Sequence, residues 1–290
     1  MKKFRILGIG LIASILLSAC GGNGNGQQIE AEGITIISLA PSNTEIIAGL
    51  GLASNLIAID NVGSAYVDGV PAGLPMFSIF GLDVEALIAL EADYIVALGS
   101  FPGDTSPLAP LYDISTVVYV LSATSIADIV ESIQYIGDAL GASSYAEALI
   151  SQMMEEIHRV EAIVEDTSTR PTVYFEVDPT YLFTTGAGTF FNELIELAGG
   201  INSFGDLAGW APLSSEAVLY SNPDIIISNA GWMPDVLELI ASRPGWHALD
   251  AIESGRLYLM STDITSRQSQ NVAIALRQLA AILHPEYFNE

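Results

Sequence analysis

The chain has 290 residues, enough for one large or two modest domains, and half of its residues are apolar. Nine basic and 34 acidic residues give a net charge of −25. This balance excludes a nucleic-acid-binding surface and makes binding to anionic lipid headgroups through charge unfavourable. Beyond residue 5 the chain keeps six arginines and no lysine. We attribute the acidity to solubility or to adaptation of the host.

The first 20 residues have the pattern of an export signal. A positively charged start is followed by a short apolar run, residues 6–17, that is too short for a membrane span. The run ends in Leu-Ser-Ala-Cys, which resembles a bacterial lipoprotein signal and implies cleavage before Cys20 and lipid attachment there. We therefore expect a signal peptide over 1–19 and a flexible tether over 20–32, with the protein exported and lipid-anchored on the periplasmic or extracellular face. The alternative is a plain secretory signal with a chance cysteine.

The two halves of the remaining chain open in the same way. Each begins with a β-rich run that is broken by proline and followed by a helix that stops at glycine. The predicted elements are a strand over 34–39 and a helix over 44–51 in the first half, and a strand over 172–177, a glycine-punctuated turn over 184–188 and a helix over 189–200 in the second.

A sharper internal repeat lies later in each half. Residues 82–98 (LDVEALIALEADYIVAL) align without a gap on residues 213–229 (LSSEAVLYSNPDIIISN). Each segment predicts a short helix, capped by Asp83 or by Ser214 or Ser215, and then a buried strand of parallel type. A fainter third pair, 118–122 and 257–261, predicts a strand that leads into a helix near the end of its half.

A long helix is predicted between the halves, over residues 143–167. Apolar residues recur there at helical spacing without glycine or proline, and Ser144 and Glu147 have the spacing of a capping box. Some 22 helical residues would span about 33 Å, the width of a small domain. We therefore expect an α/β protein in which a rigid helix joins two Rossmann-like lobes, 33–142 and 168–290. The alternative is an ordinary long helix within one larger domain.

Four motifs carry a resemblance to a known family over nearly the whole chain after residue 33. They are SLAPSNTE at 38–45, GLDVEALIALEAD at 81–93, FTTGAG at 183–188 with LAGG at 197–200, and WAPLSSE at 210–216. With them the chain resembles the helical-backbone (class III) substrate-binding lipoproteins of bacterial ABC importers, which capture cobalamin, ferric siderophores and haem. The resemblance implies two lobes joined by one long helix, a ligand cleft between them, and little closure, because a helix resists bending.

The resemblance also implies a partner. Glu85 and Glu216 occupy the same place in the repeat, one in each lobe. Matching glutamates in the family dock onto arginines of the two permease subunits, so the expected partner of this monomeric protein is a permease dimer with its ATPase. The other interpretation is that each glutamate stabilises the N-terminus of its own helix, an effect of about 0.3–1 kcal/mol.

Candidate ligand contacts come from loops that the lobes turn toward each other. Trp210 lies in a predicted loop and matches a tryptophan of the family's cobalamin binder; Phe80 and Tyr66 match aromatic cleft positions or belong to the core. Gly186 and Gly188 begin a helix and would turn backbone N–H groups to the cleft. They lack the third glycine of a dinucleotide-binding motif, so NAD binding is not indicated.

The end of the second half adds polar candidates. Asp263 and Arg267 follow the last predicted strand, and Trp232 follows the strand before it. Arg267 would contact ligand amides or carboxylates, or it would cap the preceding strand or pair with Asp263. A single arginine favours a neutral, amide-rich corrinoid over a strongly anionic siderophore, and haem remains possible through Tyr66 or another tyrosine as an axial ligand.

Other classes of function receive little support from the sequence. The three histidines, His158, His247 and His284, are scattered, which disfavours a site for a bare metal ion. The motifs of serine hydrolases, zinc proteases and P-loop enzymes are absent, so we expect neither an enzyme nor a bound cofactor. A structural or adhesive surface lipoprotein is the alternative from a different class.

Overall fold

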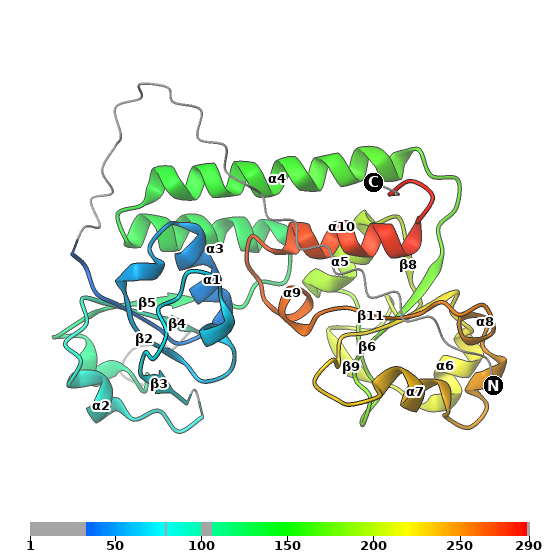
Figure 1. Cartoon of the computed structure of the whole chain (residues 1–290), viewed down its shortest axis with the longest axis horizontal. Coiled ribbons are helices and arrows are strands. Elements are labelled where there is room, and N and C mark those ends of the chain that lie inside the picture. Colours follow the sequence, from blue (N-terminus) through cyan, green and yellow to red (C-terminus); the bar gives the residue numbers. More distant parts are fainter. Residues whose placement is uncertain (1–32, 79, 100–105, 289–290) are drawn as a thin grey trace.

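The computed structural model describes residues 33–78, 80–99 and 106–288. The predicted signal peptide, the tether and the lipidation site at Cys20 lie outside the described residues. The described chain forms two α/β lobes side by side beneath one long helix, α4 (Ser143–Glu165), as predicted (Figure 1).

The N-terminal lobe is built on a five-stranded parallel sheet with the order β3-β2-β1-β4-β5. Its strands are β1 (Ile36–Ser38), β2 (Leu56–Asp60), β3 (Met76–Phe77), β4 (Tyr94–Leu98) and β5 (Thr116–Val120). Its helices are α1 (Pro41–Gly49), α2 (Val84–Ile88) and α3 (Ile126–Ala139). Ile36 and Ile37 of β1 are both fully buried on opposite faces of this sheet, which is why the strand is apolar without alternation.

The C-terminal lobe has a six-stranded mixed sheet with the order β11-β10-β6-β7-β9, and β8 pairs with β6. Its strands are β6 (Thr172–Asp178), β7 (Phe183–Thr185), β8 (Ile201–Asn202), β9 (Trp210–Pro212), β10 (Ile225–Ser228) and β11 (Leu257–Leu259). Its helices are α5 (Phe190–Leu197), α6 (Ser215–Ser221), α7 (Val236–Ala241), α8 (Asp250–Glu253), α9 (Thr262–Ser266) and α10 (Val272–Leu283).

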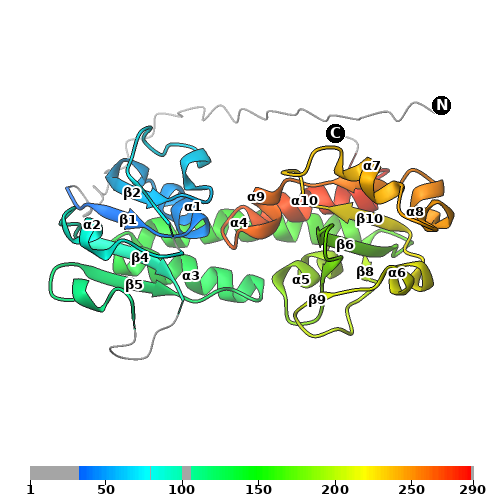
Figure 2. The same ribbon diagram turned by 90° about the horizontal axis from the view of Figure 1, so that it is seen from below.

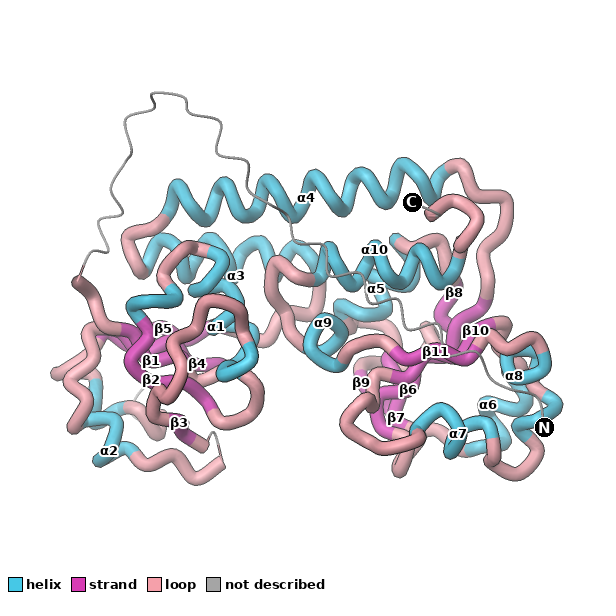
Figure 3. Tube along the Cα trace, viewed as in Figure 1, coloured by secondary structure: helices cyan, strands magenta, loops and turns pink. Residues whose placement is uncertain are grey.

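The two sheets share one topology, as the internal repeat predicts (Figure 3). In the first lobe β1 lies between β2 and β4, and β5 follows β4; in the second, β6 pairs in parallel with β8 and β10, and β11 follows β10. The antiparallel strands β7 and β9 are an addition of the second lobe. The repeated segments fold as predicted into α2 with β4 and α6 with β10, and Asp83 and Ser214 accept the capping hydrogen bonds.

Helix α4 covers both lobes. Its buried residues, among them Met153, Ile157 and Val160, belong to a hydrophobic core that also includes residues of α3, α5 and α10, whereas the outer face of each sheet packs into a separate cluster. The predicted capping box at Ser144 and Glu147 is wrong: the helix starts at Ser143 with Ala142 as N-cap and without a side-chain cap. The chain turns into α4 directly from α3, and Ala142 is held there by its N–H bond to Gly137 O (2.7 Å). Within the described part of the chain, no helix combines the length and apolar character needed to cross a membrane.

One further boundary differs from the prediction. The first helix was expected from residue 44, after a break at 40–43, but α1 begins at Pro41. Proline is well suited to the first helical position, where its missing N–H has no partner to lose. The polar residues of the motif, Ser42 to Glu45, therefore lie near the N-terminus of α1.

Candidate functional site

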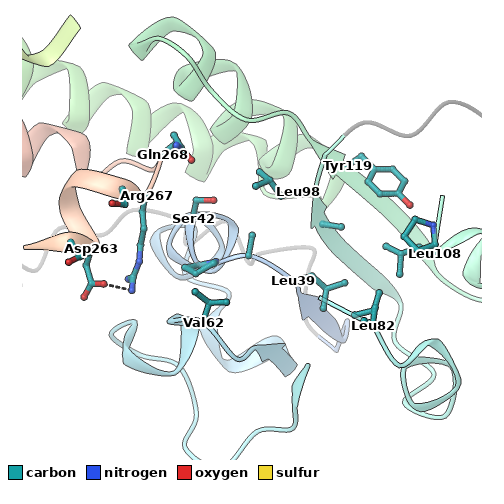
Figure 4. A pocket seen from close by; sticks show the side chains of 17 residues that line it. Leu39, Ser42, Val62, Leu82, Leu98, Leu108, Tyr119, Asp263, Arg267 and Gln268 are labelled. Atoms are coloured by element: carbon teal, nitrogen blue, oxygen red, sulfur yellow. Dashed lines mark hydrogen bonds and ion pairs between the residues drawn. The ribbon is translucent and has the colours of Figure 1, made fainter. Parts of the chain in front are cut away.

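A cavity of about 770 Å³ lies at the carboxyl ends of the N-terminal lobe's strands, where helix α9 of the C-terminal lobe faces them (Figure 4). This is the expected position for a ligand in an open parallel sheet, and the volume suits a small-molecule site. The described residues that line it are mostly apolar: Leu39, Ala40, Pro41, Ser42, Val62, Gly81, Leu82, Ala97, Leu98, Pro107, Leu108 and Tyr119 from the N-terminal lobe, and Thr262, Asp263, Ser266, Arg267 and Gln268 from the C-terminal lobe.

A buried polar network holds the loops at this edge. Thr44 Oγ1 donates to Ser38 Oγ (2.7 Å) and lies 2.7 Å from Ser64 Oγ, which in turn bonds the carboxylate of Asp60. Asp60 Oδ1 also accepts from the backbone N–H of Val62 (2.7 Å) and Gly63 (3.1 Å). These bonds fix the turn after β2, so Val62 reaches the cavity from a rigid support.

Arg267 is the only cation that the structure places among the described lining residues, and it is neutralised by two carboxylates. Its Nη1 donates to Glu45 Oε1 (2.7 Å) across the lobes, and its Nη2 donates to Asp263 Oδ1 (2.5 Å) in α9. Two predicted ligand residues, Asp263 and Arg267, are therefore together at the cavity, in the ion pair that the alternative interpretation expected. The lining as a whole offers no uncompensated positive charge.

Tyr119 contributes a phenol at the opposite end of the cavity. Burial raises its pKa to about 12, and its hydroxyl is hydrogen-bonded to Ser106 and lies 3.4 Å from Tyr112 Oη. It is neutral at physiological pH and can serve as donor or acceptor to a polar ligand group. Nothing in the sequence pattern distinguished this tyrosine from a core residue of β5.

The aromatic candidates lie outside the set of residues that line this cavity. Tyr66, Phe80 and Trp232 are 84%, 84% and 61% exposed, so none of them is a core residue in this structure. Trp210 is 42% exposed and contacts the ring of Phe190 edge-on, with centroids 6.4 Å apart. The predicted loop at Trp210 is wrong, because this residue lies in the edge strand β9, paired with Thr185 of β7.

One exposed aromatic residue, Tyr181, was not among the candidate ligand contacts predicted from the sequence. Tyr181, 69% exposed, follows β6 in a turn that Asp178 stabilises by accepting from the backbone N–H of Thr180 (2.7 Å). The available signal was a tyrosine two residues after the Asp178-Pro179 break of the second half.

The two candidate glycines have different roles. The prediction that Gly186 turns its N–H to a ligand is wrong, because this N–H donates to Gly209 O (2.9 Å). A Cβ at Gly186 would lie 2.2 Å from Leu207 O, so glycine is needed there for the close approach of two backbones. Gly188 is exposed, adopts φ +75° and precedes Thr189, the N-cap of α5.

A second arginine, Arg243, is mostly buried within the C-terminal lobe. Arg243 donates to both carboxylate oxygens of Glu176 (2.5 and 3.0 Å) and to Pro179 O (2.9 Å), and its guanidinium lies 4.5 Å from the ring centre of Trp246. Tyr174 Oη donates to the same carboxylate (2.8 Å), and burial raises the pKa of this tyrosine. The network fixes β6 to the segment after α7. Because the Glu176 carboxylate compensates the charge of Arg243, this arginine offers no free positive charge to a ligand.

Glu85 and Glu216 are both exposed in the first turns of α2 and α6. These helices lie in different lobes, on the side away from α4 (Figures 1 and 2). The capping hydrogen bonds are made by Asp83 and Ser214, so neither glutamate is needed as an N-cap. Among the described residues, no cluster of three or more His, Cys, Asp or Glu side chains has the arrangement of a metal-ion site.

Comparison with known proteins gives consistent relatives. An ABC transporter substrate-binding lipoprotein of Bacillus subtilis, YvrC, described as uncharacterized, is 29% identical over 267 residues, covering 90% of this chain and 83% of its own length. A vitamin B12-binding protein of Photorhabdus laumondii is 26% identical over 237 residues, covering 80% of this chain and 82% of its own. A crystal structure from Staphylococcus epidermidis, described as a possible iron-binding (periplasmic solute-binding) protein, superposes with a TM-score of 0.76 and 30% identity, over 86% of this chain and 98% of that one.

Residues 36–263 match the periplasmic binding protein family. This match covers the strands, both repeats and the long helix, which are the parts that set the cavity between the lobes. The chain therefore belongs to the periplasmic binding protein family, whose members are solute-binding proteins of transport systems and not enzymes.

Proposed function

We propose that this protein is an extracytoplasmic lipoprotein that captures a large metal-chelate ligand, with a corrinoid such as cobalamin favoured, and delivers it to an ABC importer. The observation that carries the proposal is the cavity of about 770 Å³, which is largely apolar and whose lining includes an arginine paired with two carboxylates. Binding of an apolar-rimmed, amide-bearing chelate requires contact area and a few polar groups more than it requires charge.

The electrostatics favour a neutral or weakly charged ligand. The carboxylates of Glu45 and Asp263 already compensate Arg267, and Glu176 compensates Arg243. A strongly anionic ferric siderophore would have to compete with these carboxylates for the guanidinium groups, at the cost of leaving a buried carboxylate unpaired. A haem or siderophore ligand is the alternative within the same mechanism.

Exposed aromatic side chains outside the cavity lining support the proposal independently of charge. Trp210, Trp232 and Tyr181 come from the C-terminal lobe, and Tyr66 and Phe80 come from loops that follow β2 and β3 in the other lobe. Aromatic faces can stack on a large flat macrocycle and bury much area with little loss of rotamer entropy. The vitamin B12-binding relatives, which cover most of this chain, agree with this class of ligand.

Delivery and anchoring complete the proposal. Cys20 would carry the lipid, Glu85 and Glu216 would dock onto the two permease subunits, and the ATPase would drive release. Because α2 and α6 are in different lobes, a change in the permease would act on both walls of the cavity.

The test is a binding screen with residues 27–290. Cyanocobalamin, cobinamide, haemin and two ferric siderophores are titrated by calorimetry and by thermal unfolding. We expect cyanocobalamin or cobinamide to bind, with a gain of about 2.7 kcal/mol in unfolding free energy at one hundred times Kd. Trp210→Ala should weaken binding, whereas Tyr220→Ala, which removes a 95% exposed aromatic on α6, should not. Binding of haemin or a siderophore in place of the corrinoids would assign the ligand to the alternative, and binding of none of them would contradict the proposal.

A further inference from the structure

Helices α3 and α10 both pack on α4, and each has its N-terminus toward the middle of the molecule in Figure 1. Helix α3 packs on α1 of its own lobe, and α10 packs on α5 of the other. The N-terminus of a helix carries partial positive charge on its free N–H groups, so a carboxylate is favourable there. A carboxylate from the opposite lobe reaches each of these two ends.

Glu45 of α1 reaches the segment that leads into α10. Its carboxylate accepts from Arg267 Nη1 (2.7 Å), from Asn271 Nδ2 (3.0 Å) and from the hydroxyl of Ser269, and its backbone O accepts from Gln270 Nε2 (2.9 Å). Asn271 is the N-cap residue of α10. Glu45 is only 5% exposed and does not line the cavity itself.

Glu193 of α5 makes the contact in the reverse direction. Its Oε2 accepts from the backbone N–H of Ile126 (2.8 Å), the first residue of α3. This bond complements the capping box of Ser125 and Asp128, which satisfies other N–H groups of the same helix end. It is a hydrogen bond between the lobes at a sequence separation of 67 residues.

The two glutamates occupy equivalent positions of the duplicated architecture. Helix α1 contains Thr-Glu-Ile-Ile at 44–47 and α5 contains Asn-Glu-Leu-Ile at 192–195, and each is the first helix of its lobe. In both segments the two aliphatic residues that follow the glutamate are fully buried in the common core, which fixes the side of the helix from which the glutamate projects. The contacts thus form a reciprocal pair that is related by the internal repeat.

We propose that Glu45 and Glu193 are paired positioning residues that hold the two lobes at a fixed separation, and that Glu45 in this way places Arg267 at the cavity. Each carboxylate joins the first helix of one lobe to the N-terminal segment of the last helix of the other. A change in the angle between the lobes would have to break one or both contacts, because each depends on a donor in the opposite lobe. The stiffness of the molecule then comes from these contacts as well as from α4.

The test measures the distance between the lobes by pulsed electron paramagnetic resonance in the full chain without ligand. Spin labels are attached at Ala89→Cys and Glu238→Cys, two exposed positions beside α2 and in α7, in a background with Cys20→Ser. We expect a single narrow distance distribution for this parent protein. The double substitution Glu45→Ala with Glu193→Ala should broaden the distribution and shift its mean.

Matched variants separate the contact from general damage. The single variant Glu193→Gln keeps an acceptor oxygen and should have the same narrow distance distribution as the parent. Glu196→Ala changes an exposed residue one turn along α5 and should also leave the distance distribution unchanged. Ile126→Pro and Ile126→Ala both remove the isoleucine side chain, but only proline removes the N–H that Glu193 accepts from, at a helix position that tolerates proline. The distance distribution of the proline variant should be broader than that of the alanine variant.

The experiment is done without ligand, so a negative result would contradict the positioning role of Glu45 and Glu193 and would leave the proposed function untouched. Equal distributions for Ile126→Pro and Ile126→Ala, or a double alanine variant as narrow as the parent, would overturn the proposal. If the double alanine variant does not fold, the comparison at Ile126 decides alone.

Discussion

Thr35 and Asp93 are joined by three hydrogen bonds, and the same three bonds recur in the other lobe. Asp93 Oδ2 accepts from Thr35 N (2.8 Å) and Oγ1 (2.9 Å), and Thr35 Oγ1 accepts from Asp93 N (3.0 Å). Thr172 and Asp224 make the corresponding contacts at 2.7, 2.7 and 2.9 Å. Each pair fixes the start of the first strand to the start of its neighbour, β1 to β4 and β6 to β10, so the sequence repeat is also a repeat of the bonds that set strand register.

This pairing predicts an effect of acid on stability. The hydrogen bonds from the N–H and the hydroxyl of Thr35 hold the pKa of Asp93 below its ordinary value of 3.8. A carboxylate with a lowered pKa stabilises the folded state above its unfolded pKa, and this contribution disappears as pH falls through the folded pKa. Asp93→Asn should therefore lower the Tm at neutral pH and reduce the further loss of Tm on acidification below about pH 4.

Asp113→Asn provides the control for this experiment, because Asp113 is an exposed carboxylate in the same region of the lobe. The two quantities to compare are the Tm at neutral pH and the slope of Tm against pH in the acid range, measured by differential scanning calorimetry. An Asp93→Asn profile parallel to that of the parent would show that the Thr35 contact does not couple to protonation.

Much of the fold could be predicted because local patterns and the repeat agree. The buried strands appear as short apolar runs bounded by Asp, Gly and Pro. In α4 the apolar residues keep a helical spacing along the whole helix, without glycine or proline. The gapless match of residues 82–98 to 213–229 then indicated two copies of one α/β lobe.

The parts that could not be predicted depend on tertiary contacts. Residues 210–212 have the turn-like composition of a loop, but pairing with β7 makes them an edge strand. The Ser144–Glu147 pattern is a valid cap in isolation, but the turn from α3 determines where α4 begins. The pair Glu45 and Arg267 joins residues 222 positions apart, and no local pattern specifies such a contact.

Permease docking gives a direct prediction for the paired glutamates on α2 and α6. Glu85→Ala with Glu216→Ala should leave ligand affinity unchanged and abolish uptake, because neither side chain contributes to the cavity or to a described capping bond. Uptake is measured in cells that depend on the transporter, and affinity is measured on the purified protein. A loss of affinity in a folded double variant would reassign these residues to the ligand.

The matched control for docking is Glu131→Ala with Glu155→Ala. It removes the same charge from two exposed positions on α3 and α4, away from α2 and α6. Uptake should be retained in this variant. Equal loss of uptake in both double variants would indicate an effect of net charge in place of docking.

The buried pair of Glu176 and Arg243 predicts a large effect on stability. Glu176 is fully buried and Arg243 nearly so, and removal of one partner leaves an uncompensated charge in the C-terminal lobe. Arg243→Met should lower the free energy of unfolding by about 3–5 kcal/mol, and the double variant Arg243→Met with Glu176→Gln should lose less than the sum of the two single changes. Urea unfolding of the four proteins measures the coupling. Strict additivity would show that the pair acts as two independent residues.

His284 predicts a second range of pH sensitivity, nearer to neutral pH. It is fully buried after α10, beside Gly199. Burial lowers the pKa of His284 from 6.5, and the nearby carboxylate of Glu286 and the backbone of Gly199 and Ala198 offset this only in part. The unfolded chain therefore takes up a proton that the folded chain resists, and stability should fall as pH decreases below about 6.5. His284→Gln should flatten the dependence of the urea midpoint on pH between about pH 7 and 5. The control is His158→Gln, which removes a histidine from an exposed position on α4 and should keep the slope of the parent. Equal slopes for all three proteins would mean that the buried imidazole is protonated as readily in the folded state as in the unfolded chain.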